Sequence, residues 1–361
     1  MICRIGILTG GGDCPGLNAV IRAIVKTAIL KYNYEVIGYK DGYKGLIDNK
    51  FINISLNDVS GILDKGGTII GTSNRDNPFN LNNQKDSEIF FDKMAEKVRT
   101  NMNMFNVDCL VVIGGDGTLT TARDLSKKGV KIIGVPKTID NDLSATDITF
   151  GFMTAVETAT EALDKLHSTA ESHHRVMILE VMGRNAGWIA LHSGIAGGAD
   201  VIIIPEISYD INKVAKQILE RKNNGKSFSI IVVSEGAKSE DGLQVVSKII
   251  NECENSLKLG GVGQKIADEI EKITCIETRV TVLGHLQRGG RPSTFDRILS
   301  TRYGVEAALL VNKEKFGVMV SLNNNKIIDV PLEDAVEKSR FVDPTGELVR
   351  ITKTIGVSFG D

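Results

Sequence analysis

The stretches "VVIGGDGTLTTA" at Val111–Ala122 and "KIIGVPKTIDNDLS" at Lys131–Ser144 decide the fold class of this chain. Each ends a continuous apolar run and then turns polar, as expected where a strand covered on both faces runs into a loop. The same kind of run recurs in RIGILT, EVIGY, RVMILEV, VIIIP, SIIVVSEG and RVTVLG. Stretches with apolar residues three and four positions apart separate these runs, for example Leu17–Tyr32 and Phe152–Ala170. The alternation predicts an α/β fold with parallel sheets and right-handed crossovers.

Length, charge and cysteine content exclude several classes of protein. A chain of 361 residues favours two domains. Its net charge of −2 gives no overall electrostatic attraction to nucleic acid or to an anionic membrane, so neither partner is expected. No long apolar run predicts a membrane span, and the N-terminal residues do not resemble a signal peptide. The five cysteines, without a Cys-x-x-Cys spacing, predict a reducing, cytoplasmic location rather than disulfides or structural zinc.

Three glycine- or aspartate-rich turns follow predicted strands, where open α/β sheets bind their ligands. In "ILTGGGDCPGLNAVIR", Gly10–Gly12 precede a helix predicted to begin near Pro15. Glycines let a ligand approach the backbone, and helix N-termini favour phosphate. A tight turn that binds no ligand would have the same sequence pattern. The spacing matches neither the dinucleotide motif nor the P-loop.

The other two turns carry carboxylates. In "GGDGT", Gly114–Thr118, Asp116 suits a Mg²⁺ ion that accompanies phosphates, or it caps the following helix. In "PKTIDND", Pro136–Asp142, two aspartates after a proline-fixed turn would supply a general base and a polar anchor, or form an Asx-rich turn. We predict that all three turns lie side by side on one sheet edge.

Cationic and polar side chains flank two later strands. They are Arg175 and Arg184 around "VMILEV", and Arg279, His285, Gln287 and Arg288 around "VTVLG". Such groups at a strand end suit a phosphate monoester. The residues alone therefore predict a magnesium-phosphate donor site opposite a phosphorylated acceptor, which indicates phosphoryl transfer. Met177 and Trp188 are assigned to the core.

The motifs "GGGDCPGLNAVIR", "GGDGT", "PKTIDND", "VMGRNAGWIA", "SEGA" and "ETRVTVLGHLQRGG" occur in the order found in the 6-phosphofructokinase family. The chain resembles that family over nearly its whole length, and the combination is specific, whereas "GGDGT" alone also occurs in NAD kinases and lipid kinases. The resemblance implies two Rossmann-like α/β/α domains with the active site in the cleft between them. It assigns residues 1–150 and about 286–336 to the donor domain, and 151–285 and about 337–361 to the fructose 6-phosphate domain.

The resemblance also implies the roles of individual residues. It implies an ATP site made of Gly12, Arg75, Asp76, Gly115, Asp116, Gly117 and Thr118, with Asp116 holding Mg²⁺. It implies that fructose 6-phosphate meets Thr138, Ile139, Asp140, Met182, Gly183, Arg184, Glu235, His285, Leu286, Gln287 and Arg288. Asp140 would take the proton from the sugar 1-hydroxyl, helped by Thr138, while Arg75, Arg184 and Mg²⁺ neutralise charge. Arg175 and Arg279 would come from a neighbouring subunit, which implies a homo-oligomer, expected to be a tetramer.

Two positions bear on the phosphoryl donor. ATP-using members of the family carry glycine at the position of Gly117, and pyrophosphate-using members carry aspartate there. Pyrophosphate users also carry lysine at the position of Lys137, so this chain is mixed. An aspartate at 117 would repel the α-phosphate by about 4 kcal/mol at 4 Å and an effective dielectric constant near 20, whereas Lys137 excludes neither donor. We therefore predict an ATP-dependent glycolytic enzyme.

Three alternatives remain open at this point. The first is a pyrophosphate-dependent enzyme of the same fold. The second is an NAD kinase, suggested by "GGDGT" but disfavoured by "GHLQRGG". The third is a non-catalytic nucleotide-binding subunit, disfavoured by the presence of Asp116, Asp140 and Arg184.

Overall fold

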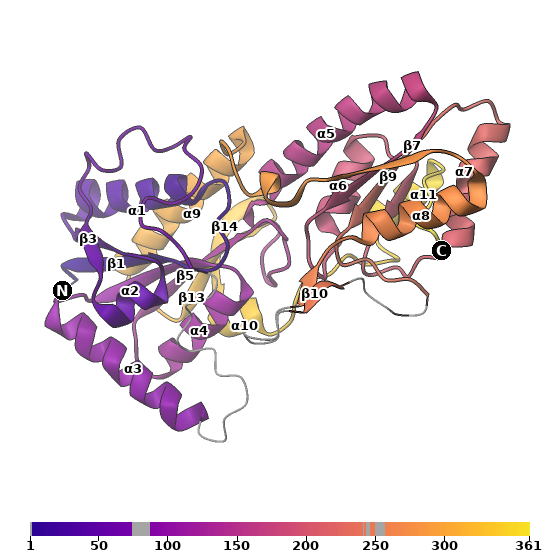
Figure 1. Cartoon of the computed structure of the whole chain (residues 1–361). Coiled ribbons are helices and arrows are strands. Elements are labelled where there is room, and N and C mark those ends of the chain that lie inside the picture. The colour runs from indigo at the N-terminus through magenta and orange to yellow at the C-terminus, as the bar shows by residue number, and fades with distance from the viewer. Residues whose placement is uncertain (1, 74–86, 241, 243–245, 250–256) are drawn as a thin grey trace. The chain divides into compact units, whose positions relative to one another are not determined.

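The computed structural model describes residues 2–73, 87–240, 242, 246–249 and 257–361 (Figure 1). The chain divides into two compact units. The first comprises Met1–Thr138, Asp142–Thr154 and Arg288–Ser339, and the second comprises Ile139–Asn141, Ala155–Gln287 and Arg340–Asp361.

The first unit is built on one large sheet. Its strands are β1 (Arg4–Thr9), β2 (Glu35–Tyr39), β3 (Phe51–Asn53), β4 (Cys109–Gly114), β5 (Ile132–Thr138), β6 (Phe150–Gly151), β13 (Val318–Asn323) and β14 (Lys326–Pro331). The order is β14-β13-β5-β4-β1-β2-β3, with β6 beside β5. The pairs β1–β2, β1–β4, β4–β5, β5–β6 and β5–β13 are parallel, whereas the edge pairs β2–β3 and β13–β14 are antiparallel.

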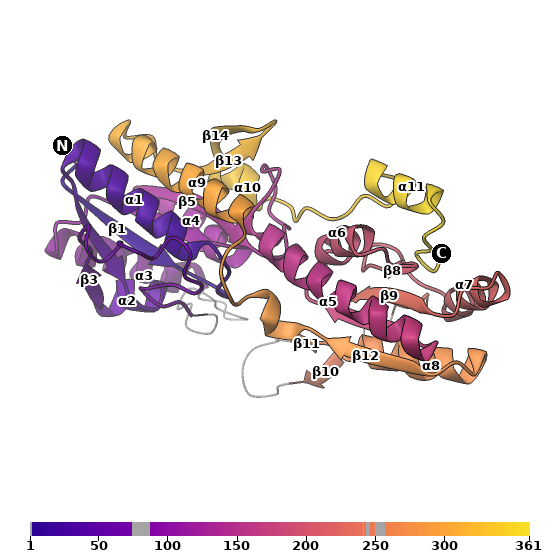
Figure 2. The same ribbon diagram turned by 90° about the horizontal axis from the view of Figure 1, so that it is seen from above.

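Helices cover both faces of this sheet (Figures 1 and 2). They are α1 (Leu17–Tyr32), α2 (Tyr43–Asp48), α3 (Ser87–Met104), α4 (Asp116–Lys127), α9 (Thr294–Asn312) and α10 (Leu332–Val336). On one face α1 packs against α9, where an added Cβ at Gly304 would come 2.7 Å from the Cβ of Ala23. On the other face α2, α3, α4 and α10 form a core with buried strand residues such as Leu8, Leu110 and Val112.

The second unit has a four-stranded parallel sheet in the order β12-β7-β9-β8. Its elements are α5 (Phe152–His173), which begins in the first unit, β7 (Val176–Val181), α6 (Trp188–Ala196), β8 (Val201–Ile203), α7 (Ile211–Asn223), β9 (Ser229–Ser234), β10 (Val246–Ile249), β11 (Leu257–Leu259), α8 (Val262–Thr274), β12 (Thr278–Val282), the 3₁₀ helix η1 (Gly284–Gln287) and α11 (Glu347–Thr354). The helices α7 and α8 bury Val214, Ile218 and Ile266 against one face of the sheet. Strands β10 and β11 form a separate antiparallel pair.

The predicted α/β fold with largely parallel sheets is confirmed, and each apolar run named above forms a strand. The proline-fixed turn predicted at Pro136 is wrong, because Pro136 lies inside β5 opposite Gly114. Neither β13 nor β6 pairs with β5 at Pro136, so the missing N–H breaks no ladder bond on that side. Trp188 is only partly buried, in contrast to the core position predicted for it, whereas Met177 is buried.

The sequence also predicted that no segment spans a membrane and that the cysteines form no disulfides. Within the described ranges, no helix combines the length and apolar character that crossing a membrane requires. The cysteines that the structure describes, Cys3, Cys14, Cys109 and Cys275, are all free thiols.

Candidate active site

The three predicted turns meet at the carboxyl edge of the first sheet. Strands β5, β4 and β1 are adjacent and parallel, so the segments that follow Thr138, Gly114 and Thr9 leave the sheet side by side. The N–H of Gly10 donates to the carbonyl of Ile113 at 3.0 Å and joins the first two turns directly. The predicted juxtaposition is confirmed.

Thr118 explains why two of these turns need glycine. Its side chain is buried, and an added Cβ would come 2.6 Å from it at Gly10 and 2.3 Å from it at Gly114. The hydroxyl of Tyr43 donates to the Thr118 carbonyl at 2.8 Å. Because the Thr118 side chain packs between the turns, the group of Thr118 best placed to bind a ligand is its backbone N–H.

The start of α4 presents backbone N–H groups beside a carboxylate. The first hydrogen bond within the helix runs from the N–H of Leu119 to the carbonyl of Gly115 at 2.9 Å, so the N–H groups of residues 116–118 have no intrahelical acceptor. Asp116 is the first helical residue and is exposed. An added Cβ at Gly117 would meet no atom within 4 Å. The protein itself therefore has room for a side chain at position 117.

Two cations lie against the glycine turn after β1. The Nζ of Lys137, whose residue is 3% exposed, donates to the carbonyl of Gly12. The Nη1 of Arg288 donates to the carbonyl of Asp13 at 3.0 Å, and an added Cβ at Gly12 would come 2.4 Å from that nitrogen. Arg288 lies in the first unit, as its place after residue 286 predicted, and its role at the 6-phosphate stays a prediction. Together the two cations make this turn favourable for an anion.

The residues present fit a phosphate-bound Mg²⁺ better than a metal held by the protein alone. Among the described residues no three His, Cys, Asp or Glu side chains gather into a metal-binding group. Mg²⁺ in kinases is bound by one or two carboxylates together with substrate phosphates and water. A single exposed Asp116 at a helix N-terminus meets that requirement.

The acceptor residues of the second unit follow adjacent strands. The loop after β7 carries Met182, Gly183 and Arg184, and Glu235 follows β9. Gly183 has φ 139° and Arg184 has φ 51°, both in the left-handed region. An added Cβ at Gly236 would come 1.7 Å from the carbonyl of Arg184, so only glycine allows the two loops to approach this closely.

Glu235 is the electrostatic centre of this group. Burial raises the pKa of its carboxyl, and the charge of nearby Asp140 raises this pKa further. The Arg184 N–H, which donates to Oε1 at 3.2 Å, and the Arg184 charge oppose that shift. Asp140 is 4% exposed and belongs to the short segment Ile139–Asn141 of the second unit, in which Ile139 is also buried. Asp140 and Arg184 therefore both lie within electrostatic reach of Glu235.

The segment after β12 forms the 3₁₀ helix η1. Its first residues continue the sheet, since the N–H of Leu283 donates to the Glu180 carbonyl at 3.1 Å. His285 and Leu286 are exposed, whereas Gln287 is buried and donates from Nε2 to the Gly284 carbonyl at 3.1 Å. Because β12 neighbours β7, this segment leaves the sheet beside the Arg184 loop.

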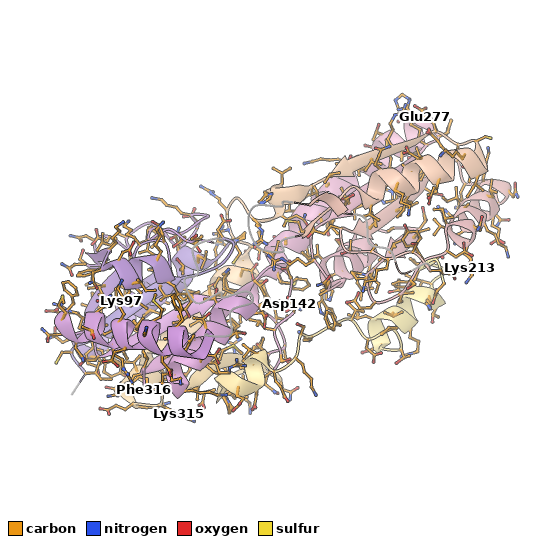
Figure 3. The ribbon with its side chains drawn as sticks, turned by 60° about the horizontal axis from the view of Figure 1, so that its bottom comes forward. Lys97, Asp142, Lys213, Glu277, Lys315 and Phe316 are labelled. Carbon is orange, nitrogen blue, oxygen red and sulfur yellow. The ribbon has the colours of Figure 1, made fainter. Side chains whose placement is uncertain are left out.

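Arg175 and Arg279 lie at the amino ends of the strands of the same sheet, whereas the Arg184 loop follows the carboxyl end of β7. Arg175 directly precedes β7, and Arg279 lies opposite Met177 near the amino end of that strand. Both pair with Glu277, which Figure 3 labels at this edge of the unit, and the Nε of Arg175 is 2.6 Å from Oε2. The six residues of β7 span about 20 Å at roughly 3.3 Å each. The structure therefore does not bring these arginines together with Arg184 of the same chain.

Two carboxylates, buried Glu180 and partly buried Glu206, were missed in the sequence. Glu180 accepts the N–H groups of Gly261 and Gly263 at the start of α8, at 3.0 and 2.8 Å. Glu206 accepts the N–H of Gly187 at the start of α6. A carboxylate directly after the apolar run VIIIP was the available signal for Glu206. Arg75 and Asp76, predicted in the ATP site, lie outside the described residues.

Comparison with known proteins identifies the family. The phosphofructokinase family model matches residues 4–311. An ATP-dependent 6-phosphofructokinase 2 of Clostridium perfringens is 60% identical over 362 residues, covering 100% of this chain and 99% of the relative. The chain belongs to the phosphofructokinase family. The resemblance predicted from the motifs is confirmed, and the NAD kinase alternative is left without support.

Other phosphofructokinases differ in the donor that their names state. A pyrophosphate–fructose 6-phosphate 1-phosphotransferase of Streptomyces coelicolor is 47% identical over 99% of this chain and 100% of the relative. The crystal structure of Pichia pastoris phosphofructokinase in the T-state matches with a TM-score of 0.81 and 33% identity, covering 93% of this chain and 36% of that one. Membership of the phosphofructokinase family therefore leaves the donor to be argued from particular residues.

Proposed function

We propose that the protein is an ATP-dependent 6-phosphofructokinase, which transfers the γ-phosphoryl group of ATP to the 1-hydroxyl of D-fructose 6-phosphate. The products are fructose 1,6-bisphosphate and ADP. The first unit binds the donor and the second unit binds the sugar phosphate. Relatives named as ATP-dependent enzymes at 46–60% identity support this proposal.

The observation that carries the choice of ATP is the open space at Gly117. A glycine that packs against nothing within 4 Å is not required by the fold at that position. Its absent side chain instead leaves room for a donor larger than pyrophosphate beside the N-terminus of α4, where anions bind favourably. Gly12, Gly115 and Thr118 line the same edge, and Arg75 and Asp76 are assigned to the site by the family resemblance alone.

Phosphoryl transfer by a kinase uses a divalent metal ion, and Mg²⁺ is the ion proposed here, held by Asp116 and the donor phosphates. When bound, it would neutralise charge on the phosphates. Lys137 and Arg288 add positive charge at the Gly12–Asp13 turn.

The sugar site is proposed to use the carboxylates and Arg184 of the second unit. Asp140 accepts the proton of the 1-hydroxyl as this oxygen attacks the terminal phosphorus in line. Because the transition state is loose, positioning and charge neutralisation supply most of the catalysis, which suits Arg184. Glu235 accepts hydrogen bonds from sugar hydroxyls, beside Met182 and Gly183.

The remaining polar residues are proposed to complete the sugar site. Thr138 and Ile139 directly precede Asp140 in sequence and meet the sugar. His285 and Arg288 hold the 6-phosphate, beside Leu286 and Gln287.

The active species is proposed to be a homo-oligomer, expected to be a tetramer, in which Arg175 and Arg279 bind the substrate of a neighbouring subunit. Their separation from Arg184 by the length of β7 supports action in trans, because an arginine side chain is far shorter than the strand. The edge strand β12 also exposes Val282, and Leu286 is 68% exposed, as expected for a surface that another subunit covers.

A pyrophosphate-dependent enzyme is the second candidate, favoured by Lys137 and by the Streptomyces coelicolor relative. The test is a donor comparison with purified protein, fructose 6-phosphate and Mg²⁺, in which the rate of fructose 1,6-bisphosphate formation is measured. We expect a far higher kcat/KM with ATP than with pyrophosphate. An equal or higher value with pyrophosphate would reject ATP as the physiological donor, and no product with either would reject the proposed function.

A further inference from the structure

The loop that carries Arg184 has a strained backbone. Arg184 has φ 51°, a left-handed conformation that residues with a Cβ adopt at an energetic cost. The preceding Gly183 has φ 139°, and the N–H of Ala186 donates back to the Gly183 carbonyl at 2.9 Å, which closes a tight turn. Such backbone conformations persist only where surrounding contacts hold them.

Two carboxylates hold the two ends of this loop. Glu235 accepts the N–H of Arg184 at 3.2 Å. Glu206 accepts the N–H of Gly187 with both oxygens, at 2.9 Å to Oε1 and 3.1 Å to Oε2. An added Cβ at Gly187 would come 2.7 Å from Oε2 of Glu206, so the glycine is what allows this approach. Glu235 has a proposed role at the sugar, whereas Glu206 is not among the residues proposed to bind either substrate.

Glu206 also binds the C-terminal segment Arg340–Val342. Its Oε1 accepts the N–H of Val342 at 2.9 Å, in addition to that of Gly187. Trp188, the residue after Gly187, donates from its indole Nε1 to the Arg340 carbonyl at 3.0 Å. The Arg340 guanidinium carbon lies 4.6 Å from the centroid of the same indole ring. Three contacts therefore tie the start of α6 to the segment Arg340–Val342.

We propose that Glu206 is a positioning residue for phosphoryl transfer. By joining Gly187 to Val342 it anchors one end of the strained loop, and so it sets the alignment of Arg184. Glu206 touches neither substrate nor donor in this proposal and acts only through the loop. The inference rests on the proposed function, because Arg184 must take part in the transfer for its alignment to affect the rate.

The test separates the reach of the Glu206 side chain from its charge. Glu206→Gln keeps an Oε1 acceptor at the same distance without the charge. Glu206→Asp keeps the charge but shortens the side chain by one methylene, so its oxygens no longer reach both N–H groups. Glu206→Ala removes the tether. A matched control is Asp210→Ala, which removes the side chain that accepts the Asn212 N–H at the start of α7, outside the proposed site.

We expect kcat with ATP and fructose 6-phosphate to rank wild type and Glu206→Gln above Glu206→Asp, and Glu206→Asp above Glu206→Ala. Misplacement of a group in the active site by about 1 Å costs about a hundredfold, so a loss of roughly 10- to 100-fold is expected for Glu206→Ala. The KM for ATP should change little, because the donor binds elsewhere. Asp210→Ala should lower thermal stability without changing kcat.

A second measurement reports on the tether itself. Trp188 is the single tryptophan of the chain, so intrinsic fluorescence follows its environment alone. Glu206→Asp and Glu206→Ala should shift the emission to longer wavelength as the Arg340–Val342 segment loosens, whereas Glu206→Gln should not. If Glu206→Ala does not fold, the comparison of the Gln and Asp variants decides the proposal.

The proposal is overturned if Glu206→Asp is as active as wild type, or if it is more active than Glu206→Gln, because charge rather than reach would then matter. A wild-type protein without activity towards either donor would contradict the proposed function instead. In that case the fluorescence ranking would still decide whether Glu206 forms the tether.

Discussion

Substitution of Gly117 by aspartate tests the choice of donor with little disturbance of the fold. Position 117 is the second residue of α4, and an added Cβ there meets nothing within 4 Å. Its backbone is not in the left-handed region, so a side chain brings no strain. Stability should therefore change by no more than about 0.5 kcal/mol, the usual range for an exposed site.

The expected effect on ATP follows from charge repulsion. Two unit charges 4 Å apart repel by about 4 kcal/mol at an effective dielectric constant of about 20, and by about 1 kcal/mol in bulk water. Since each 1.4 kcal/mol is about tenfold in affinity, Gly117→Asp should weaken ATP binding by between about fivefold and about a thousandfold. The α-phosphate does not change during the transfer, so the loss should raise KM for ATP more than it lowers kcat.

Steady-state kinetics with ATP and with pyrophosphate at saturating fructose 6-phosphate measure this effect. Pyrophosphate has no α-phosphate, so its kinetics should be affected far less than those of ATP. Gly117→Ala is the control for size without charge and should retain most ATP activity. If Gly117→Asp binds ATP like the wild type, or if Gly117→Ala is equally impaired, repulsion of the α-phosphate is not the basis of donor choice.

Three further predictions concern the sugar site and assembly. Asp140→Asn should lower kcat by about 10²–10⁴-fold with little change in KM for ATP, and a near-normal kcat would remove Asp140 as the base. Burial raises the pKa of Glu235, so the stability of the wild type should fall as the pH rises from the ordinary glutamate pKa through the raised value. Above that pH range Glu235→Gln should have a higher melting temperature than wild type, and below it the two melting temperatures should be equal. The same variant should show a raised KM for fructose 6-phosphate. Arg175→Ala and Asp140→Ala subunits should each be nearly inactive alone and should partly recover activity after refolding together; mixed oligomers that stay inactive would show that Arg175 does not act in trans.

Strand positions and the donor edge could be predicted from local patterns. Runs such as Cys109–Gly114 are apolar throughout because both faces of the sheet are covered by helices, and this property is visible in the chain itself. The edge strands β3 and β14 were not predicted. Strand β14 is half-exposed and joins β13 through Asn324 and Asn325, both at positive φ, as in a tight hairpin turn.

The amino-acid sequence by itself determined the α/β class, the order of the strands along the chain and the three turns that phosphate chemistry needs, because these depend on residues that are neighbours in sequence. Only the tertiary structure decided which distant groups meet. It brought Arg288 to the carbonyl of Asp13, 275 positions away, and Glu206 to the N–H of Val342, 136 positions away. Polar groups that folding removes from water, wholly or in part, need hydrogen-bond partners, and the partner is chosen by how the sheets and helices pack, which no local pattern encodes.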